Sequence, residues 1–200
     1  MPAPSIKLVI LGRDGILNVY REGHVTVPQE WQAIPGALEA ASRINHAGWH
    51  LVVATNQAGI GRGMIDKAAV NAVNAHMNQQ LMAQGGRIDA VFFCPHTPED
   101  HCECRKPKPG MLLEIGRRYG VDLAQVPFAS DTLRDLLAAR AAGCEPHLVQ
   151  SGRAASLSDA QLQDIVQQVP DTRVHDDLAA FADFLLRRDD VNDSASGGLS

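Results

Sequence analysis

Three of the four cysteines in this 200-residue sequence lie beside a histidine, in the order Cys94, His96, Cys102 and Cys104. Three thiolates and one imidazole fill the tetrahedral coordination of Zn²⁺ and leave no position open for water, which is the pattern of a structural zinc site. The alternatives are two disulfides, or free thiols beside an unrelated histidine, and a reducing compartment favours the metal over disulfides. We therefore expect a zinc ion to hold this loop.

Two other residues bear on that expectation. His101 lies inside the loop and competes with His96 as the fourth ligand, but Cys-x-His mirrors the Cys-x-Cys spacing at the other end and favours His96. Cys144 stands apart, after a helix-ending glycine, and is interpreted as an ordinary core residue.

Charged and polar residues of two segments suit a phosphorylated ligand. Arg105 and Lys106 follow the cysteines directly, and an arginine fork beside a compact ammonium suits phosphate, although a solvated basic turn is the plainer interpretation. The stretch TNQAGIGRG offers hydroxyl, amide, guanidinium and backbone N–H groups to phosphate oxygens or sugar hydroxyls. Its candidate binding residues are Thr55, Asn56, Gln57 and Arg62.

Three aspartates complete the set of candidate chemical groups. Asp14 lies in GRDGILN, in the loop after a predicted strand, and Asp131 lies in SDTLRD at the end of another, and together they would make a small acidic Mg²⁺ site. Asp135 follows Asp131 by one helical turn and is either an exposed helix residue or a support for that site.

Alternating strands and helices must position these groups. We expect strands at residues 6–11, 49–56, 88–94, 126–131, 145–150 and 171–174, which are short apolar runs bounded by turn residues. Helices are expected at residues 36–46, 66–82, 108–120, 132–143 and 158–168. Asp66 is the predicted N-cap of the second of these, and Asp176 that of a final helix. Residues 12–35 lack such periodicity and predict a long loop.

This alternation predicts an α/β fold, a Rossmann-like, doubly wound parallel sheet with helices on both faces. Ligands of such sheets bind at the carboxyl ends of the strands, where residues 12–14, residues 55–57, the cysteine loop and Asp131 all fall. Residues 1–188 are expected to form a single domain, and the polar, Gly/Ser-rich tail 189–200 to be disordered.

Bulk properties argue against several classes of protein. A net charge of −5 does not suggest a basic face for nucleic acid. No apolar run is long enough to span a membrane, and the N-terminal segment lacks the apolar core and cleavage site of a signal peptide. We therefore expect a cytoplasmic monomer that binds neither nucleic acid nor membrane.

The ordered motifs GRDGILN, TNQAGIGRG, CPHTPEDHCECRKPKPGM and SDTLRD, within about residues 6–149, resemble those of the haloacid dehalogenase superfamily of phosphatases. The zinc loop followed by RKPKPG is similar to one branch, which acts on a heptose bisphosphate or on histidinol phosphate. The resemblance implies a fold without a large cap domain, in which the zinc loop shapes the pocket. It also implies Mg²⁺-dependent removal of the 7-phosphate from D-glycero-D-manno-heptose 1,7-bisphosphate, in lipopolysaccharide precursor synthesis, with histidinol phosphate as the alternative substrate.

The resemblance further implies roles for individual residues. An aspartate at position 12 would attack phosphorus, and Asp14 would act as general acid and then as base. Magnesium would be held by the carboxylate at position 12, the backbone carbonyl of Asp14 and Asp131. The residues implied to bind the transferring phosphoryl group are Thr55 and Lys106, and those implied to contact the rest of the substrate are Asn56, Arg62 and Arg105.

The sequence departs from the family pattern at four positions. Ile16 stands where threonine is usual, Ser130 where glycine is usual, and Thr132 where lysine is frequent. The first aspartate is replaced by Gly12, which has no side chain, so an aspartyl-phosphate cannot form there. We therefore expect a strongly impaired phosphatase, and the alternative is a non-catalytic protein that binds sugar phosphates.

Overall fold

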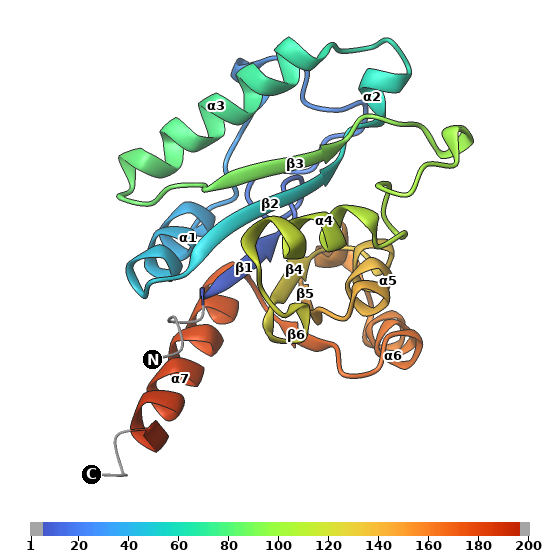
Figure 1. Cartoon of the computed structure of the whole chain (residues 1–200). Coiled ribbons are helices and arrows are strands. Elements are labelled where there is room, and N and C mark those ends of the chain that lie inside the picture. Colours follow the sequence, from blue (N-terminus) through green and yellow to red (C-terminus); the bar gives the residue numbers. More distant parts are fainter. Residues whose placement is uncertain (1–5, 197–200) are drawn as a thin grey trace.

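A computed structural model of the chain describes residues 6–196, with the backbone alone for residues 190–196 (Figure 1). Residues 1–5 and 197–200 lie outside the described residues, and the latter include the end of the tail expected to be disordered. Six parallel strands form one sheet in the order β3-β2-β1-β4-β5-β6. This confirms the predicted parallel α/β sheet.

Each strand lies within or close to its predicted segment. The strands are β1 (Leu8–Leu11), β2 (His50–Asn56), β3 (Ala90–Cys94), β4 (Pro127–Ser130), β5 (Glu145–Val149) and β6 (Arg173–His175). The strand order reverses at β1, which pairs with β2 on one side and β4 on the other. A crevice outside the carboxyl ends of the strands at such a reversal is the usual ligand site of this architecture.

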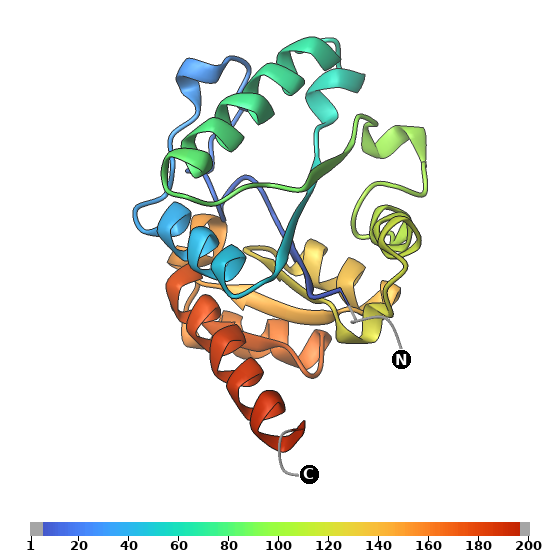
Figure 2. The same ribbon diagram turned by 60° about the vertical axis from the view of Figure 1, so that its left-hand side comes forward.

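Helices cover both faces of the sheet, as predicted (Figures 1 and 2). On one face, α1 (Ala37–His46), α3 (Lys67–Ala83) and α7 (Leu178–Ser196) share a core with Val9 and Leu11 of β1. On the other face, α4 (Gly110–Tyr119) and α5 (Leu133–Ala142) share a core with Leu8 and Ile10, and α6 (Asp159–Gln168) packs beside α5. The central strand is therefore apolar on both faces, which is why it reads as a continuous apolar run.

Of the two N-cap residues predicted from the sequence, the structure confirms one. Asp66 caps α3, since its side chain accepts a 2.7 Å hydrogen bond from the Ala69 N–H. The prediction of Asp176 as the cap of α7 is wrong, because Asp177 accepts the corresponding bond from the Ala180 N–H at 2.7 Å. The backbone of α7 continues to Ser196, past the domain boundary expected at residue 188, and extending a helix that has already nucleated costs little.

Two loops carry more structure than the sequence predicts. Residues 12–35 contain a 3₁₀ turn at Pro28–Glu30 and two isolated bridges, which pair Asn18 with Asp14 and with Ala33. The stretch after β2 forms a short helix, α2 (Ala58–Gly61). Both loops lie at the carboxyl ends of the strands. Among the described helices, none is both long enough and apolar enough to cross a bilayer.

Candidate active site

A cavity of about 310 Å³ lies at the carboxyl ends of β1, β2 and β4. The structure brings most of the predicted ligand-binding residues together around it: Gly12, Asp14, Thr55, Asn56, Arg62, Arg105, Lys106, Asp131 and Asp135. Gln57 is not in the cavity lining. It is buried behind Thr55, and its amide Nε2 donates a hydrogen bond to Thr55 Oγ1 at 2.9 Å.

The position next to the end of β1 has no side chain to offer. The Gly12 N–H donates to the Ala129 carbonyl at 2.9 Å, which ties the loop to β4. A Cβ added at Gly12 would lie 3.2 Å from Ile16 Cγ1 and 3.4 Å from Ser130 Oγ, and the backbone there is outside the left-handed region. The local backbone therefore does not require glycine, and a Cβ at residue 12 needs only a small shift of Ile16.

Asp14 is held as a carboxylate by a ring of donors. Its Oδ1 accepts from Asn18 Nδ2 at 3.0 Å and from Arg13 Nη2 at 3.1 Å, and its Oδ2 accepts from Gln57 Nε2 at 3.3 Å. Burial raises the pKa of Asp14, but the Arg13 charge and these hydrogen bonds outweigh burial and leave the pKa below its ordinary value. Arg13 is itself oriented by Asn74, whose Oδ1 accepts from its Nη1 at 3.1 Å. Asp14 is thus held in its ionised form at neutral pH.

Lys106 lies at the floor of the cavity in a buried ion pair with Asp135. Its Nζ is 2.5 Å from Asp135 Oδ2 and 2.7 Å from the Ala54 carbonyl oxygen. The same carboxylate oxygen accepts from Ser130 Oγ at 2.8 Å. Burial works against ionisation of Asp135, but Lys106 and Arg134 outweigh it and lower the pKa of Asp135 to about 2. Of the two interpretations left open by the sequence, the structure supports a buried supporting role for Asp135.

Asn56 joins β2 to the segment that follows the cysteine loop. Its amide Nδ2 donates to the Lys106 carbonyl at 3.0 Å, and its Oδ1 accepts from the Lys106 N–H at 3.2 Å. Asn56 therefore uses both ends of its side chain to hold the backbone of Lys106, although it also lines the cavity.

Asp131 directly follows β4 and forms an ion pair with Arg153, a residue that was not predicted from the sequence. Its Oδ2 accepts from the Arg153 backbone N–H at 2.8 Å and lies 3.3 Å from Arg153 Nη1. A Cβ at Gly15 would lie 2.1 Å from Asp131 Oδ2, so only glycine allows the two loops to approach this closely. Burial raises the pKa of Asp131, with the Arg153 groups acting in the opposite direction.

These contacts leave an incomplete donor set for magnesium, a cation that prefers hard oxygen ligands in octahedral geometry. Position 12 contributes no carboxylate. The Asp14 carboxylate already accepts hydrogen bonds from Arg13, Asn18 and Gln57. The Asp131 carboxylate forms an ion pair with Arg153. The predicted magnesium site at Asp14 and Asp131 therefore remains a prediction, with one anionic ligand fewer than the family pattern supplies.

Several residues around the cavity were missed by the sequence analysis, namely Arg13, Tyr20, Arg21, Glu22, His24, Arg134 and Arg153. Arg13 lies inside the catalytic-loop motif, so its place next to Asp14 was a usable signal. Arg153 follows β5, and the rule that ligands bind at strand ends would have found it. Tyr20, Arg21, Glu22 and His24 belong to the irregular loop over the sheet edge, for which the sequence offers no periodic pattern.

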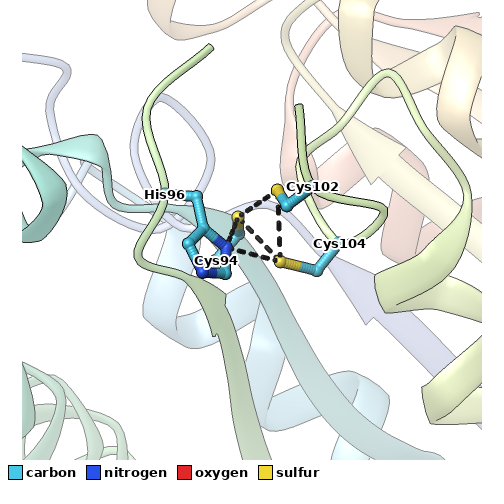
Figure 3. Close-up of side chains that lie close together, drawn as sticks. All are labelled: Cys94, His96, Cys102 and Cys104. Carbon is cyan, nitrogen blue, oxygen red and sulfur yellow. Dashed lines mark hydrogen bonds between the residues drawn. The ribbon is translucent and has the colours of Figure 1, made fainter. Parts of the chain in front are cut away.

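The predicted zinc ligands converge at one point between the end of β3 and the following loop (Figure 3). The sulfurs of Cys94 and Cys104 each lie 3.6 Å from that of Cys102, and 2.9 Å from each other. His96 Nδ1 lies 3.6 Å from Cys94 Sγ and 3.3 Å from Cys104 Sγ. A tetrahedral zinc with Zn–S bonds of about 2.3 Å holds its sulfurs roughly 3.8 Å apart, so the donor set fits this metal with a small expansion.

The structure also separates the alternatives for this loop. His101 is not in the converging group, whereas His96 is. None of the four cysteines forms a disulfide, which disfavours the disulfide alternative. Cys144 is buried in the core on the α4 and α5 face, which confirms its interpretation as a core residue.

Comparison with protein families and curated proteins gives a consistent picture. Residues 103–181 match the model of the HAD-hydrolase-like family. The chain is 49% identical over 183 residues to the D-glycero-beta-D-manno-heptose-1,7-bisphosphate 7-phosphatase of Bordetella bronchiseptica, covering 91% of this chain and 99% of the relative. It is 43% identical to the enzyme of the same name from Pseudomonas aeruginosa, covering 92% of this chain and 99% of the relative.

Solved structures give the same result. The crystal structure of D,D-heptose 1,7-bisphosphate phosphatase from B. bronchiseptica, complexed with magnesium and phosphate, superposes with a TM-score of 0.85 at 48% identity. The superposition covers 92% of this chain and 99% of the B. bronchiseptica chain. The corresponding enzyme from Burkholderia thailandensis superposes with a TM-score of 0.67 at 46% identity, covering 90% of this chain and 98% of that one.

Proposed function

The chain belongs to the D-glycero-beta-D-manno-heptose-1,7-bisphosphate 7-phosphatase family of HAD-like hydrolases, and we propose that it binds a sugar bisphosphate of this kind with strongly reduced hydrolysis. The observation that carries the proposal is Gly12, a position without a side chain inside a cavity whose other predicted phosphate-binding groups are present. The role in lipopolysaccharide precursor synthesis that the resemblance implies is kept as a prediction.

The charge of the cavity supports binding of a bisphosphate. The cavity lining holds more cationic than acidic side chains. The cationic residues are Arg13, Arg21, Arg62, Arg105, Lys106, Arg134 and Arg153. The acidic residues are Asp14, Glu22, Asp131 and Asp135. The chain as a whole carries a net charge of −5, so this excess is a local arrangement. Within the described residues, Arg62 and Arg105 form no ion pair with a carboxylate, which leaves two guanidinium groups for a second phosphate.

Catalysis is limited by the missing nucleophile. Gly12 cannot form a covalent phosphoryl intermediate, and removal of a nucleophile costs on the order of a millionfold in turnover. Asp14 is a poor replacement for it, because both carboxylate oxygens already accept hydrogen bonds, from Arg13, Asn18 and Gln57. Direct attack by water, with Asp14 taking its proton, is the residual route, and it is slow.

Zinc is proposed as a structural component of the site. Cys94, His96, Cys102 and Cys104 would hold it, and Arg105 and Lys106 follow the last ligand directly. With four protein ligands the metal has no place for substrate or water, so it fixes the loop and takes no part in the chemistry.

The proposal is tested by measuring binding and turnover on the same protein. Calorimetric titration with heptose 1,7-bisphosphate is expected to give saturable binding, while phosphate release remains near background even at high enzyme concentration. Histidinol phosphate serves as the comparison ligand and is expected to bind more weakly, because it carries one phosphate. Turnover comparable to that of an active family member would show that our account of residue 12 is wrong, and absence of binding to both ligands would overturn the assignment of the pocket.

A further inference from the structure

Arg153 is fixed beside the acidic end of β4 by contacts on several sides. Its backbone N–H donates to Asp131 Oδ2 at 2.8 Å, and its Nη1 lies 3.3 Å from the same oxygen. Its guanidinium carbon lies 3.6 Å from the centre of the Tyr20 ring, a close cation–π stack. The preceding Gly152 has φ +51°, and a Cβ there would lie 2.4 Å from Gly15 Cα, so the loop after β5 is locked against the loop after β1.

Arg153 provides the positive counter-charge of Asp131. Asp131 is only 3% exposed, and a buried carboxylate needs a positive partner. Arg13, Lys106 and Arg134 also line the cavity, but they are paired with different acids, Arg13 with Asp14, and Lys106 and Arg134 with Asp135. In the family pattern a metal ion performs this task with the help of a carboxylate at position 12, which this chain does not have.

Arg153 also remains available to a ligand. It lines the cavity, and 36% of its side chain is exposed. A guanidinium has five N–H donors, and Nη1 is the one that lies on Asp131. The close contact with Tyr20 restricts the guanidinium, which limits the side-chain entropy lost when a phosphate binds.

We propose that Arg153 takes the place of a divalent cation on Asp131, so that this pocket binds a phosphate monoester without metal, with the Arg153 guanidinium as a ligand of the phosphate. The inference rests on the proposed function, since it concerns the same cavity. It adds to that function a metal-independent mode of recognition and a residue that provides it.

The test is calorimetric titration of heptose 1,7-bisphosphate into the full chain, once with a chelator of magnesium that leaves tightly bound zinc in place and once with excess magnesium. We expect the dissociation constants of the unmodified chain under the two conditions to agree within about threefold. Arg153→Gln is expected to weaken the metal-free binding by at least about tenfold, the size of one lost hydrogen bond to a charged group. Arg153→Lys, which keeps the charge, should recover part of that loss.

A matched control and two contrary outcomes complete the test. Arg117→Gln removes the same charge from the exposed face of α4, where Arg117 pairs with Glu114, and should leave the affinity unchanged. Binding by the unmodified chain only when magnesium is present, or an unchanged metal-free affinity in Arg153→Gln, overturns the inference while leaving the proposed function standing. Absence of binding under both conditions overturns the proposed function and the inference with it. Thermal melting of each variant shows whether it is folded.

Discussion

Lys106 and Asp135 form an ion pair that is almost completely excluded from solvent, with 2.5 Å between Nζ and Oδ2. The two residues lie on segments that the fold brings together, Lys106 after the cysteine loop and Asp135 in the first turn of α5. Without a carboxylate at position 12, Asp135 is the acid that makes a salt bridge with this ammonium. The resemblance assigns Lys106 to the phosphoryl group, so its buried partner sets how that positive charge is presented to a ligand.

Replacement of Asp135 by Asn is expected to destabilise the protein strongly. The variant keeps the shape of the side chain but leaves the buried Lys106 ammonium without its counter-charge, and breaking a buried pair in this way costs about 3–5 kcal/mol. The free energy of unfolding from guanidinium denaturation measures the loss. Glu114→Gln, which breaks the exposed pair of Glu114 with Arg117, is the control and should cost less than about 1 kcal/mol. Equal losses in the two variants would show that the Lys106–Asp135 pair is not the stabilising contact inferred here.

Gly12→Asp is expected to raise phosphate release from heptose 1,7-bisphosphate by at least about a thousandfold in the presence of magnesium, because it restores the nucleophile and a metal ligand together. The backbone at residue 12 accepts a side chain, and the closest atom, Ile16 Cγ1 at 3.2 Å, has to move only slightly. Gly12→Asn fills the same space without the acid and is the matched control. A rate in Gly12→Asp no higher than in Gly12→Asn would rule out a nucleophilic role for this position.

The stability of the protein should fall as the pH decreases from about 6.5 to 4, because of two buried histidines. His147 Nδ1 and His175 Nε2 share a 2.9 Å hydrogen bond, and burial, His147 and Arg173 lower the pKa of His175 from 6.5 to about 4. Burial likewise lowers the pKa of His147. Between pH 6.5 and about 4, His175 is protonated in the unfolded chain but neutral in the folded chain, so a decrease in pH favours unfolding. Above about pH 6.5 the histidine is neutral in both states and the effect vanishes.

The magnitude of this effect is expected to be about 2 kcal/mol between about pH 7 and pH 5 for His175 alone, measured by denaturant unfolding at each pH. His175→Gln keeps a hydrogen-bonding group next to His147 but cannot titrate, so its unfolding free energy should depend less steeply on pH in this range. An identical pH dependence in the two proteins would assign the acid sensitivity to other groups.

Much of the fold follows from local patterns in the sequence. The apolar runs that became β1 and β2 are buried on both faces, and the Asp66 cap is defined by residues within one helical turn. The strand-end rule then located Asp14, Thr55 and Asp131 without any knowledge of their contacts. The cysteine cluster was equally accessible, because the spacing of its ligands is local.

The remaining features depend on contacts that local pattern does not encode. Arg153 meets Asp131 and Tyr20 only because three loops converge, and the sequence separation between these residues is large. The choice between Asp176 and Asp177 as the cap of α7 is a shift of one residue, which is set by the path of the preceding strand. Asp135 was undecided, because the first turn of a helix shows which side is buried only after α5 has docked on the sheet.

Each chain is expected to bind one zinc ion, measured by mass spectrometry under native conditions and by metal analysis. Cys104→Ser should abolish this binding, because one of four donors is lost from a site in which Cys104 Sγ lies 2.9 Å from Cys94 Sγ and 3.3 Å from His96 Nδ1. The affinity for heptose 1,7-bisphosphate should fall by about tenfold or more, since Arg105 follows Cys104 directly and loses its anchor. Cys144→Ser changes the same atom type in the core and should retain zinc. Retention of zinc in Cys104→Ser, or its loss in Cys144→Ser alone, would show that the metal is held by other residues of the chain.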